Sequence, residues 1–314
     1  MLEGVYRPED PAPGSADDGS FQRAKSTVRN WIAPSDNRSK LGRGRYHLYA
    51  AWNCPWAHRV LLVRAVKGLS AEIGVSYALP RRTEDGWVYD DDPAFGVRAL
   101  HEVYARIRPG YTGRVTVPLL WDMAEDRGVS NESADLVRML DAAFPDRGPN
   151  LAPAALVADI DAWNKDIYAG LNNGVYRAGF ARTQDAYEAG CRDVFATLNR
   201  IEDRLSASPY LCGDTLTEAD LRLFPTLARF DVAYHGAFKC NIRRLVDYPA
   251  TWAYARRIYA LPEVADTVRF DVYKAGYYSP SPQRNPLGIV PLGPEIDWSL
   301  PADVAPDTVR LADA

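Results

Sequence analysis

Hydrophobic and polar positions along the first part of the chain follow a strand–helix–strand order. Apolar and polar residues alternate over 45–51, helical spacing follows over 55–67, and 73–79 again has strand spacing. This pattern predicts a βαβ unit with two parallel strands and a right-handed crossover. A later β-prone run, 115–121, contains Pro118. Because proline cannot donate a ladder hydrogen bond, we expect this strand to be an edge strand or to begin near Pro118.

The segments around these strands have weaker signals. Residues 80–113 are rich in charged residues, Gly and Pro, which predicts a long inserted loop carrying Trp87. Residues 122–130 are interpreted as a polar turn. An amphipathic helix is expected over 132–144, with Ser130 or Asn131 as its N-cap.

Beyond a linker at 145–150, helical spacing dominates. Thr217 and Asp220 have the positions of a capping box, and Pro249 and Pro262 suit the first turns of helices. We predict a small α/β domain followed by an all-helical domain. The expected helices span 153–173, 184–206, 217–234, 249–260 and 262–274. The expected divisions are an irregular extension at 1–43, an α/β domain at 44–145, a helical domain at 151–278 and an extended tail at 279–314.

Composition excludes several classes of protein. The 314 residues are 47% hydrophobic, which suits about two domains with buried cores. The net charge of −4 comes without a basic block, so a nucleic-acid partner is not expected. Neither a membrane span nor a signal peptide is visible. The four cysteines are scattered, which favours a reducing cytoplasm over a disulfide scaffold.

Cys54 is the candidate for chemistry. It lies between the first predicted strand and a helix that opens with Pro55, a residue suited to the first helical turn. Unpaired backbone N–H groups and the positive end of the helix dipole meet at this position, and they favour the thiolate. No Cys-x-x-Cys is present, so we expect a monothiol cycle resolved by an external thiol. The alternative is a small buried thiol.

His58 lies one helical turn beyond Cys54 and could be mistaken for a base or a ligand. A thiolate that is already ionised needs no base, so we expect a structural role. One Cys and one His are too few for a zinc site, and no metal is expected.

Long motifs occur in a fixed order through the chain. Cys54-Pro-Trp-Ala-His-Arg59 is one, and Arg114-Val-Thr-Val-Pro-Leu-Leu-Trp-Asp122 is another. Others occupy residues 46–49, 131–134, 173–181, 223–231, 235–241 and 285–291. Together, from about residue 25 to 295, they resemble the glutathionyl-hydroquinone reductases, the Xi class of the glutathione transferase superfamily.

The resemblance implies a fold and a reaction. The fold is α/β plus all-α, with a thioredoxin-like N-terminal domain and a helical C-terminal domain. The implied reaction uses glutathione as cosubstrate and needs no metal. The catalytic residue, Cys54, removes glutathione from an S-glutathionyl-hydroquinone, and a second glutathione resolves the mixed disulfide to give oxidised glutathione and hydroquinone. The family also implies a homodimer.

The same resemblance assigns a glutathione site. It implies a cis bond before Pro118, which would let the Val117 backbone pair with the cysteinyl part of glutathione. Free amides at the start of the helix near Ser133 can receive a carboxylate, and the carboxylate of Glu132 would accept the ammonium group of the ligand. The implied glutathione-binding set is Trp87, Arg114, Val117, Pro118, Glu132 and Ser133. Simpler structural roles are the alternatives: helix capping for Glu132, a surface charge for Arg114, a core filler for Trp87.

Three tyrosines are implied to line the hydroquinone pocket: Tyr176, Tyr234 and Tyr277. Phenol hydroxyls can hydrogen-bond the two oxygens of a hydroquinone, and their rings can pack against its face. The chain departs from the family pattern near Tyr277. The family usually has His-Tyr-Tyr-x-Ser-His, whereas this sequence has Gly276-Tyr-Tyr-Ser-Pro-Ser281.

Other functions remain open from the sequence. A broader, omega-like thioltransferase or dehydroascorbate reductase would use the same cysteine. A conjugating transferase would use Ser or Tyr to stabilise the glutathione thiolate, which the cysteine disfavours. The third alternative is a non-catalytic binding protein with the glutathione transferase fold.

Overall fold

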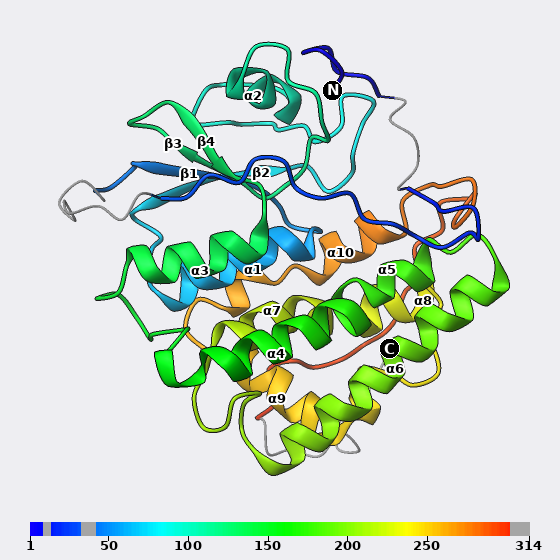
Figure 1. Ribbon diagram of the computed structural model, residues 1–314. Helices are drawn as coiled ribbons and strands as arrows, with labels where there is room; N and C mark the ends of the chain where they lie inside the picture. Colours follow the sequence, from blue (N-terminus) through cyan, green and yellow to red (C-terminus); the bar gives the residue numbers. More distant parts are fainter. Residues whose placement is uncertain (9–13, 33–41, 302–314) are drawn as a thin grey trace. The chain divides into compact units, whose positions relative to one another are not determined.

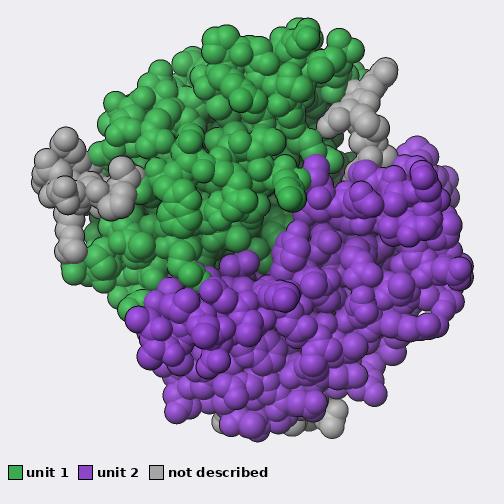
Figure 2. Space-filling view, viewed as in Figure 1, with its two compact units in different colours: residues 1–11, 25–150 green, residues 12–24, 151–314 purple. Residues whose placement is uncertain are grey.

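The structure is a computed structural model, which describes residues 1–8, 14–32 and 42–301. The chain divides into two compact units (Figure 2). Unit 1 comprises residues 1–11 and 25–150, and unit 2 comprises residues 12–24 and 151–314.

Unit 1 is built on a four-stranded sheet of order β2-β1-β3-β4. The strands are β1 (Tyr46–Ala51), β2 (Ile73–Ala78), β3 (Leu119–Asp122) and β4 (Arg127–Ser130). The predicted βαβ unit is confirmed, because β1 and β2 pair in parallel with Tyr46 opposite Ile73. The third strand begins immediately after Pro118 and runs antiparallel to β1, so the missing amide hydrogen of Pro118 stays out of the ladder.

Two segments interpreted as loops contain regular structure. The predicted polar turn at 122–130 holds β4, which pairs with β3 and is too short to show alternation. The predicted loop at 80–113 contains α2 (Leu100–Ile107). Its apolar residues are spaced as on one helix face, and Glu102 accepts hydrogen bonds from the amides of Arg98 and Ala99 at its start.

The other helices of unit 1 are α1 (Pro55–Val66) and α3 (Ser133–Ala143). Figure 1 shows both on one side of the sheet, with α2 on the other. The expected N-cap of α3 was wrong. Glu132 is the cap, and its carboxylate accepts the Ala134 amide at 3.1 Å, because Ser130 belongs to β4 and Asn131 turns its side chain to Val28.

The described parts of the N-terminal extension lack helices and long strands; residues 14–24 belong to unit 2, and residues 1–8 and 25–32 belong to unit 1. The amide of Asn30 donates to Val129, and that of Asn131 donates to Val28, so residues 28–30 lie along β4. Tyr6 stacks on His101 of α2 with ring centroids 4.4 Å apart.

Unit 2 is helical, as predicted, but its long helices are interrupted. The expected helix at 153–173 is a 3-10 turn at Ala154–Leu156, then α4 (Val157–Ile167), then a π-helical turn at Tyr168–Asn172. The expected helix at 217–234 is α7 (Glu218–Arg229) followed by another π-helical turn at Phe230–Tyr234. The capping box at Thr217 and Asp220 is confirmed. The α-helices are α4 (Val157–Ile167), α5 (Gly174–Gly179), α6 (Gln184–Ala207), α7 (Glu218–Arg229), α8 (His235–Ala237), α9 (Pro249–Tyr259) and α10 (Phe270–Tyr277).

The end of the chain departs most from expectation. The helix predicted at 262–274 begins only at Phe270, and Pro262 lies in the turn before a 3-10 segment at Ala265–Thr267. The tail lacks helices and strands over 279–301, as expected, yet it does not only cover the surface. Trp298 is 6% exposed and packs against the rings of Trp252, Phe224 and Phe270.

No helix in the described part of the chain is long and apolar enough to cross a membrane.

Candidate functional site

Cys54 is placed by the strand before it and the helix after it. Its amide donates to Ala51 at the end of β1, and its carbonyl accepts the amide of His58 in the first turn of α1. Cys54 is therefore the N-cap of α1, the position expected from Pro55. Its side chain is partly exposed, as a nucleophile requires. Cys191, Cys212 and Cys240 are buried, and burial raises the pKa of each thiol, which disfavours the reactive thiolate.

Val117 and Pro118 come together with Cys54. The Cys54 thiol lies 3.6 Å from the Val117 carbonyl oxygen. The bond between Val117 and Pro118 is cis, as expected. Both residues are buried just before β3.

The start of α3 is the second feature of unit 1. The Glu132 carboxylate accepts the Ala134 amide and the Ser26 hydroxyl, the latter at 2.9 Å. Ser133 is buried, and its hydroxyl accepts a long hydrogen bond from Arg59 of α1 at 3.4 Å. A hydrogen bond thus joins the first turns of α1 and α3, and two further hydrogen bonds hold the Glu132 carboxylate at the start of α3.

Trp87 and Arg114 lie outside regular structure. Trp87 is partly exposed in the segment between β2 and α2, where the Arg82 guanidinium lies 5.3 Å from its ring centroid. Arg114 is exposed between α2 and β3, and its carbonyl accepts the Tyr111 hydroxyl. The two residues thus belong to the connections on either side of α2, whereas Val117 is the predicted glutathione contact that meets the Cys54 thiol.

A buried polar network orders the segment that carries Trp87. The Ser76 hydroxyl donates to the Asp92 carboxylate at 2.5 Å, and His47 Nε2 lies 2.8 Å from the same hydroxyl. Since the hydroxyl proton is used on Asp92, His47 must donate from Nε2. Asp92 also accepts the amides of the turn that follows it, those of residues 94, 95 and 97.

The three predicted tyrosines meet in unit 2. The Tyr277 hydroxyl on α10 lies 2.7 Å from that of Tyr176 on α5 and 3.0 Å from that of Tyr234. Burial raises the pKa of Tyr234 and Tyr277 well above the usual value. Both are therefore neutral phenols at physiological pH, able to donate as well as accept.

Positive charge surrounds these tyrosines. Arg229 is fully buried, its guanidinium lies 3.7 Å from the Tyr273 ring centroid, and it acts electrostatically on Tyr234 and Tyr277. Arg23 lies 4.7 Å from the Tyr176 ring centroid and donates to Asn173 at 2.7 Å. Two guanidinium groups thus lie close to the tyrosine cluster.

Several residues near the candidate sites were missed from the sequence. Ser26 reaches Glu132 across about a hundred positions, and Arg23 reaches Tyr176 across about 150, so no local spacing signals either contact. Arg229 lies within one of the family motifs, but nothing in the sequence around it indicates that it interacts with the tyrosines. His58 is buried, consistent with a structural role. Within the described ranges, no cluster of three or more His, Cys, Asp or Glu side chains could hold a metal ion.

Comparisons with known proteins identify both domains. Residues 53–143 match the family described as glutathione S-transferase, N-terminal domain, and residues 184–257 match glutathione S-transferase, C-terminal domain. The chain is 45% identical to the glutathionyl-hydroquinone reductase PcpF of Sphingobium chlorophenolicum, over 94% of this chain and 96% of that protein.

Solved structures give the same result for the fold. The glutathione-bound structure of YqjG from Escherichia coli K-12 has a TM-score of 0.86 at 38% identity, covering 98% of this chain and 99% of that one. The glutathione transferase Xi of Phanerochaete chrysosporium has a TM-score of 0.85 at 41% identity, covering 92% and 96%. The fold is thus a thioredoxin-like domain followed by a helical glutathione transferase domain. The chain belongs to the glutathione transferase superfamily and, within it, to the Xi-class glutathionyl-hydroquinone reductases.

Proposed function

We propose that this protein reduces S-glutathionyl-hydroquinones to hydroquinones, with glutathione as cosubstrate and Cys54 as nucleophile. The observation that carries the proposal is the position of Cys54 at the N-cap of α1, partly exposed. A relative with 45% identity bears the name of this activity, and a solved relative is described as glutathione-bound. A helix start favours the thiolate because unpaired amides and the helix dipole stabilise negative charge there.

The reaction has two steps. The Cys54 thiolate attacks the sulfur of the glutathionyl group, so that a sulfur–sulfur bond forms and the carbon–sulfur bond to the ring breaks. The electron pair of the broken bond stays on the ring carbon, which takes up a proton. A second glutathione then attacks the mixed disulfide, which regenerates Cys54 and yields oxidised glutathione. Cys54 and glutathione supply two electrons, and the ring receives them.

Unit 1 contributes the proposed glutathione contacts. The Val117 backbone near the thiol would pair with the cysteinyl part of the ligand, beside Pro118. Glu132 would accept the ammonium group, and the Ser133 end of α3 would receive the carboxylate. The Ser26 hydrogen bond supports the role of Glu132, because it holds the carboxylate in one orientation. Trp87 would pack against glutathione, and Arg114 would interact with it through its charge.

Unit 2 contributes the proposed hydroquinone contacts. The Tyr277 hydroxyl lies within hydrogen-bond distance of the hydroxyls of Tyr176 and Tyr234. A hydroquinone oxygen could replace one of these mutual bonds without leaving a buried hydroxyl unsatisfied.

We also propose a cytoplasmic homodimer. Sedimentation equilibrium would report the assembly.

The test is product analysis by mass spectrometry after mixing the protein with glutathione and an S-glutathionyl-hydroquinone. We expect free hydroquinone and oxidised glutathione in equal amounts. A conjugating transferase would leave the S-glutathionyl-hydroquinone unchanged, because a hydroquinone ring accepts a thiol only after oxidation to the quinone. If neither product accumulates above the rate without protein, the proposed function is wrong.

A further inference from the structure

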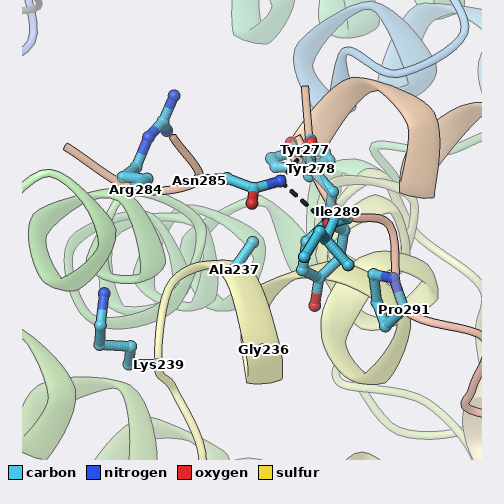
Figure 3. Close-up of a pocket in the computed structure, with 9 residues that line it drawn as sticks. All are labelled: Gly236, Ala237, Lys239, Tyr277, Tyr278, Arg284, Asn285, Ile289 and Pro291. Atoms are coloured by element: carbon cyan, nitrogen blue, oxygen red, sulfur yellow. Dashed lines mark hydrogen bonds between the residues drawn. The ribbon is translucent and has the colours of Figure 1, made fainter. Parts of the chain in front are cut away.

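A pocket of about 260 Å³ opens beside the tyrosine cluster, wholly within unit 2. Its lining combines Tyr277 and Tyr278 with two cationic side chains, Arg284 and Lys239. In the view of Figure 3, Arg284 and Lys239 are on one side of the pocket and the apolar Ile289 and Pro291 on the other. Among the described residues no carboxylate lines it. This volume lies just below the range of about 300–1,000 Å³ that is typical of pockets for drug-sized ligands, so it suits a smaller molecule such as a single substituted ring.

The wall that carries Arg284 is held by hydrogen bonds. The Asn285 side chain donates to the carbonyls of Tyr278 and Ile289 (Figure 3), and the backbones of Ser281 and Asn285 bridge each other. The segment after α10 therefore turns back on itself at a fixed place. This turn positions Arg284 on the aromatic cluster.

Arg284 packs on the same rings that support the tyrosines. Its guanidinium lies 4.4 Å from the Phe180 ring centroid and 5.8 Å from that of Phe238. The Phe180 ring in turn stacks with Tyr176, and the Phe238 ring contacts Tyr277. The side chain is half-buried, and no ion pair joins it to a carboxylate of the described residues.

A half-buried guanidinium without an acidic partner attracts an anionic ligand. Burial lowers the pKa of Arg284, while its electrostatic interaction with Tyr277 and Tyr176 acts in the opposite direction. The group nonetheless stays charged at physiological pH, since an arginine in a protein is not deprotonated. Its planar fork matches a carboxylate, and such a pair is stronger than a neutral hydrogen bond. Lys239 adds a second positive charge at the same pocket.

We infer that Arg284 is a specificity-determining residue that selects hydroquinones carrying a carboxylate on the ring. This inference rests on the proposed function and adds a substrate class to it. The tyrosines hold the ring oxygens, and Arg284 receives the carboxylate in a pocket that Lys239 also lines.

The test compares two matched substrates. One is the glutathionyl adduct of 2,5-dihydroxybenzoate, and the other is that of its methyl ester, which has the same ring without the charge. For the unmodified protein we expect kcat/KM to be about tenfold higher for the acid. Arg284→Gln should remove most of this ratio, and Arg284→Lys should restore part of it. Arg192→Gln, at an exposed site on α6, is the control and should leave the ratio unchanged.

A binding measurement separates this inference from the proposed function. Calorimetry of 2,5-dihydroxybenzoate and its methyl ester with the Cys54→Ser protein needs no turnover. Preference for the acid that is lost in the Cys54→Ser, Arg284→Gln double variant supports the inference even if no reduction is found. Turnover of both adducts at equal kcat/KM, with equal binding of the two ligands, would overturn it and leave the proposed function standing.

Discussion

At the scale of single residues, burial sets the protonation of the groups in unit 2. It keeps the phenols of Tyr234 and Tyr277 neutral, which leaves their hydroxyls able to donate. Burial also raises the pKa of the Asp231 carboxyl, to about 6. Asp231 accepts the amides of Leu245 and Val246, which favour its charged form but do not offset the burial. The side chain is thus a titrating group in a structural position.

Asp231 makes a pH-dependent contribution to stability whose sign is fixed. Its folded pKa of about 6 lies above the ordinary value of 3.8, so the folded protein binds the proton more tightly than the unfolded chain. The contribution is fully present below about pH 4 and is lost as the pH rises to about 6. Asp231→Asn removes this loss. We expect the unfolding free energy of the variant, relative to the unmodified protein, to rise by about 2–3 kcal/mol between pH 4 and pH 7.

Urea unfolding at a series of pH values measures this difference. Asp203→Asn, an exposed site on α6, controls for the loss of one surface charge. A pH-independent difference between the Asp231 variant and the unmodified protein would show that the carboxyl titrates normally.

At the scale of elements, the segment between β2 and α2 depends on one buried acid. Burial raises the pKa of Asp92, but hydrogen bonds from Ser76 and three backbone amides outweigh it, and the net pKa is lowered. The carboxylate thus holds a turn next to Trp87 and anchors it to β2.

We expect Asp92→Ala to destabilise the protein by about 2–4 kcal/mol, because several buried donors lose their acceptor at once. The loss should be local first. Hydrogen exchange at the amides of residues 94, 95 and 97 should accelerate more than exchange within β1. Asp90→Ala, at an exposed site in the same segment, is the matched control. Uniform acceleration across the sheet would contradict a local role.

The elements that the sequence predicted share a property: their signals are local. The apolar run of β1, all of which is buried, the Pro55 start of α1 and the capping box of α7 are each set by neighbours in the chain. The strand β4 was missed because four residues form it only by pairing with β3. The α10 start was misplaced because Pro262 suits a helix start that the chain does not use.

The candidate site divides in the same way. Cys54 was predicted from its immediate surroundings, while the tyrosines and the glutathione contacts came from resemblance to a family. The role proposed for Arg284 could not be predicted from the sequence, because it depends on interactions with Phe180 and Tyr176, about a hundred residues earlier in the chain. Ser26 was hidden for the same reason. Long-range contacts between ordinary residues leave no local pattern.

At the scale of the whole molecule, each unit carries half of the proposed chemistry. Unit 1 holds the thiol and the helix starts, and unit 2 holds the phenols and their surrounding cations. The N-terminal segment contributes to both units, since Ser26 donates a hydrogen bond to Glu132 in unit 1 and Arg23 packs on Tyr176 in unit 2. In the proposed reaction, the thiol of unit 1 takes glutathione from a hydroquinone.

The most direct test follows that transfer in a single turnover. The protein is mixed with one equivalent of an S-glutathionyl-hydroquinone in the absence of glutathione, quenched with acid, digested and analysed by mass spectrometry. We predict one glutathionyl group on the peptide containing Cys54, one equivalent of free hydroquinone, and neither product with Cys54→Ser. Cys191→Ala, at a buried thiol, should behave like the unmodified protein. Hydroquinone release with Cys54 unmodified, or release that persists in Cys54→Ser, would contradict a transfer through this thiol.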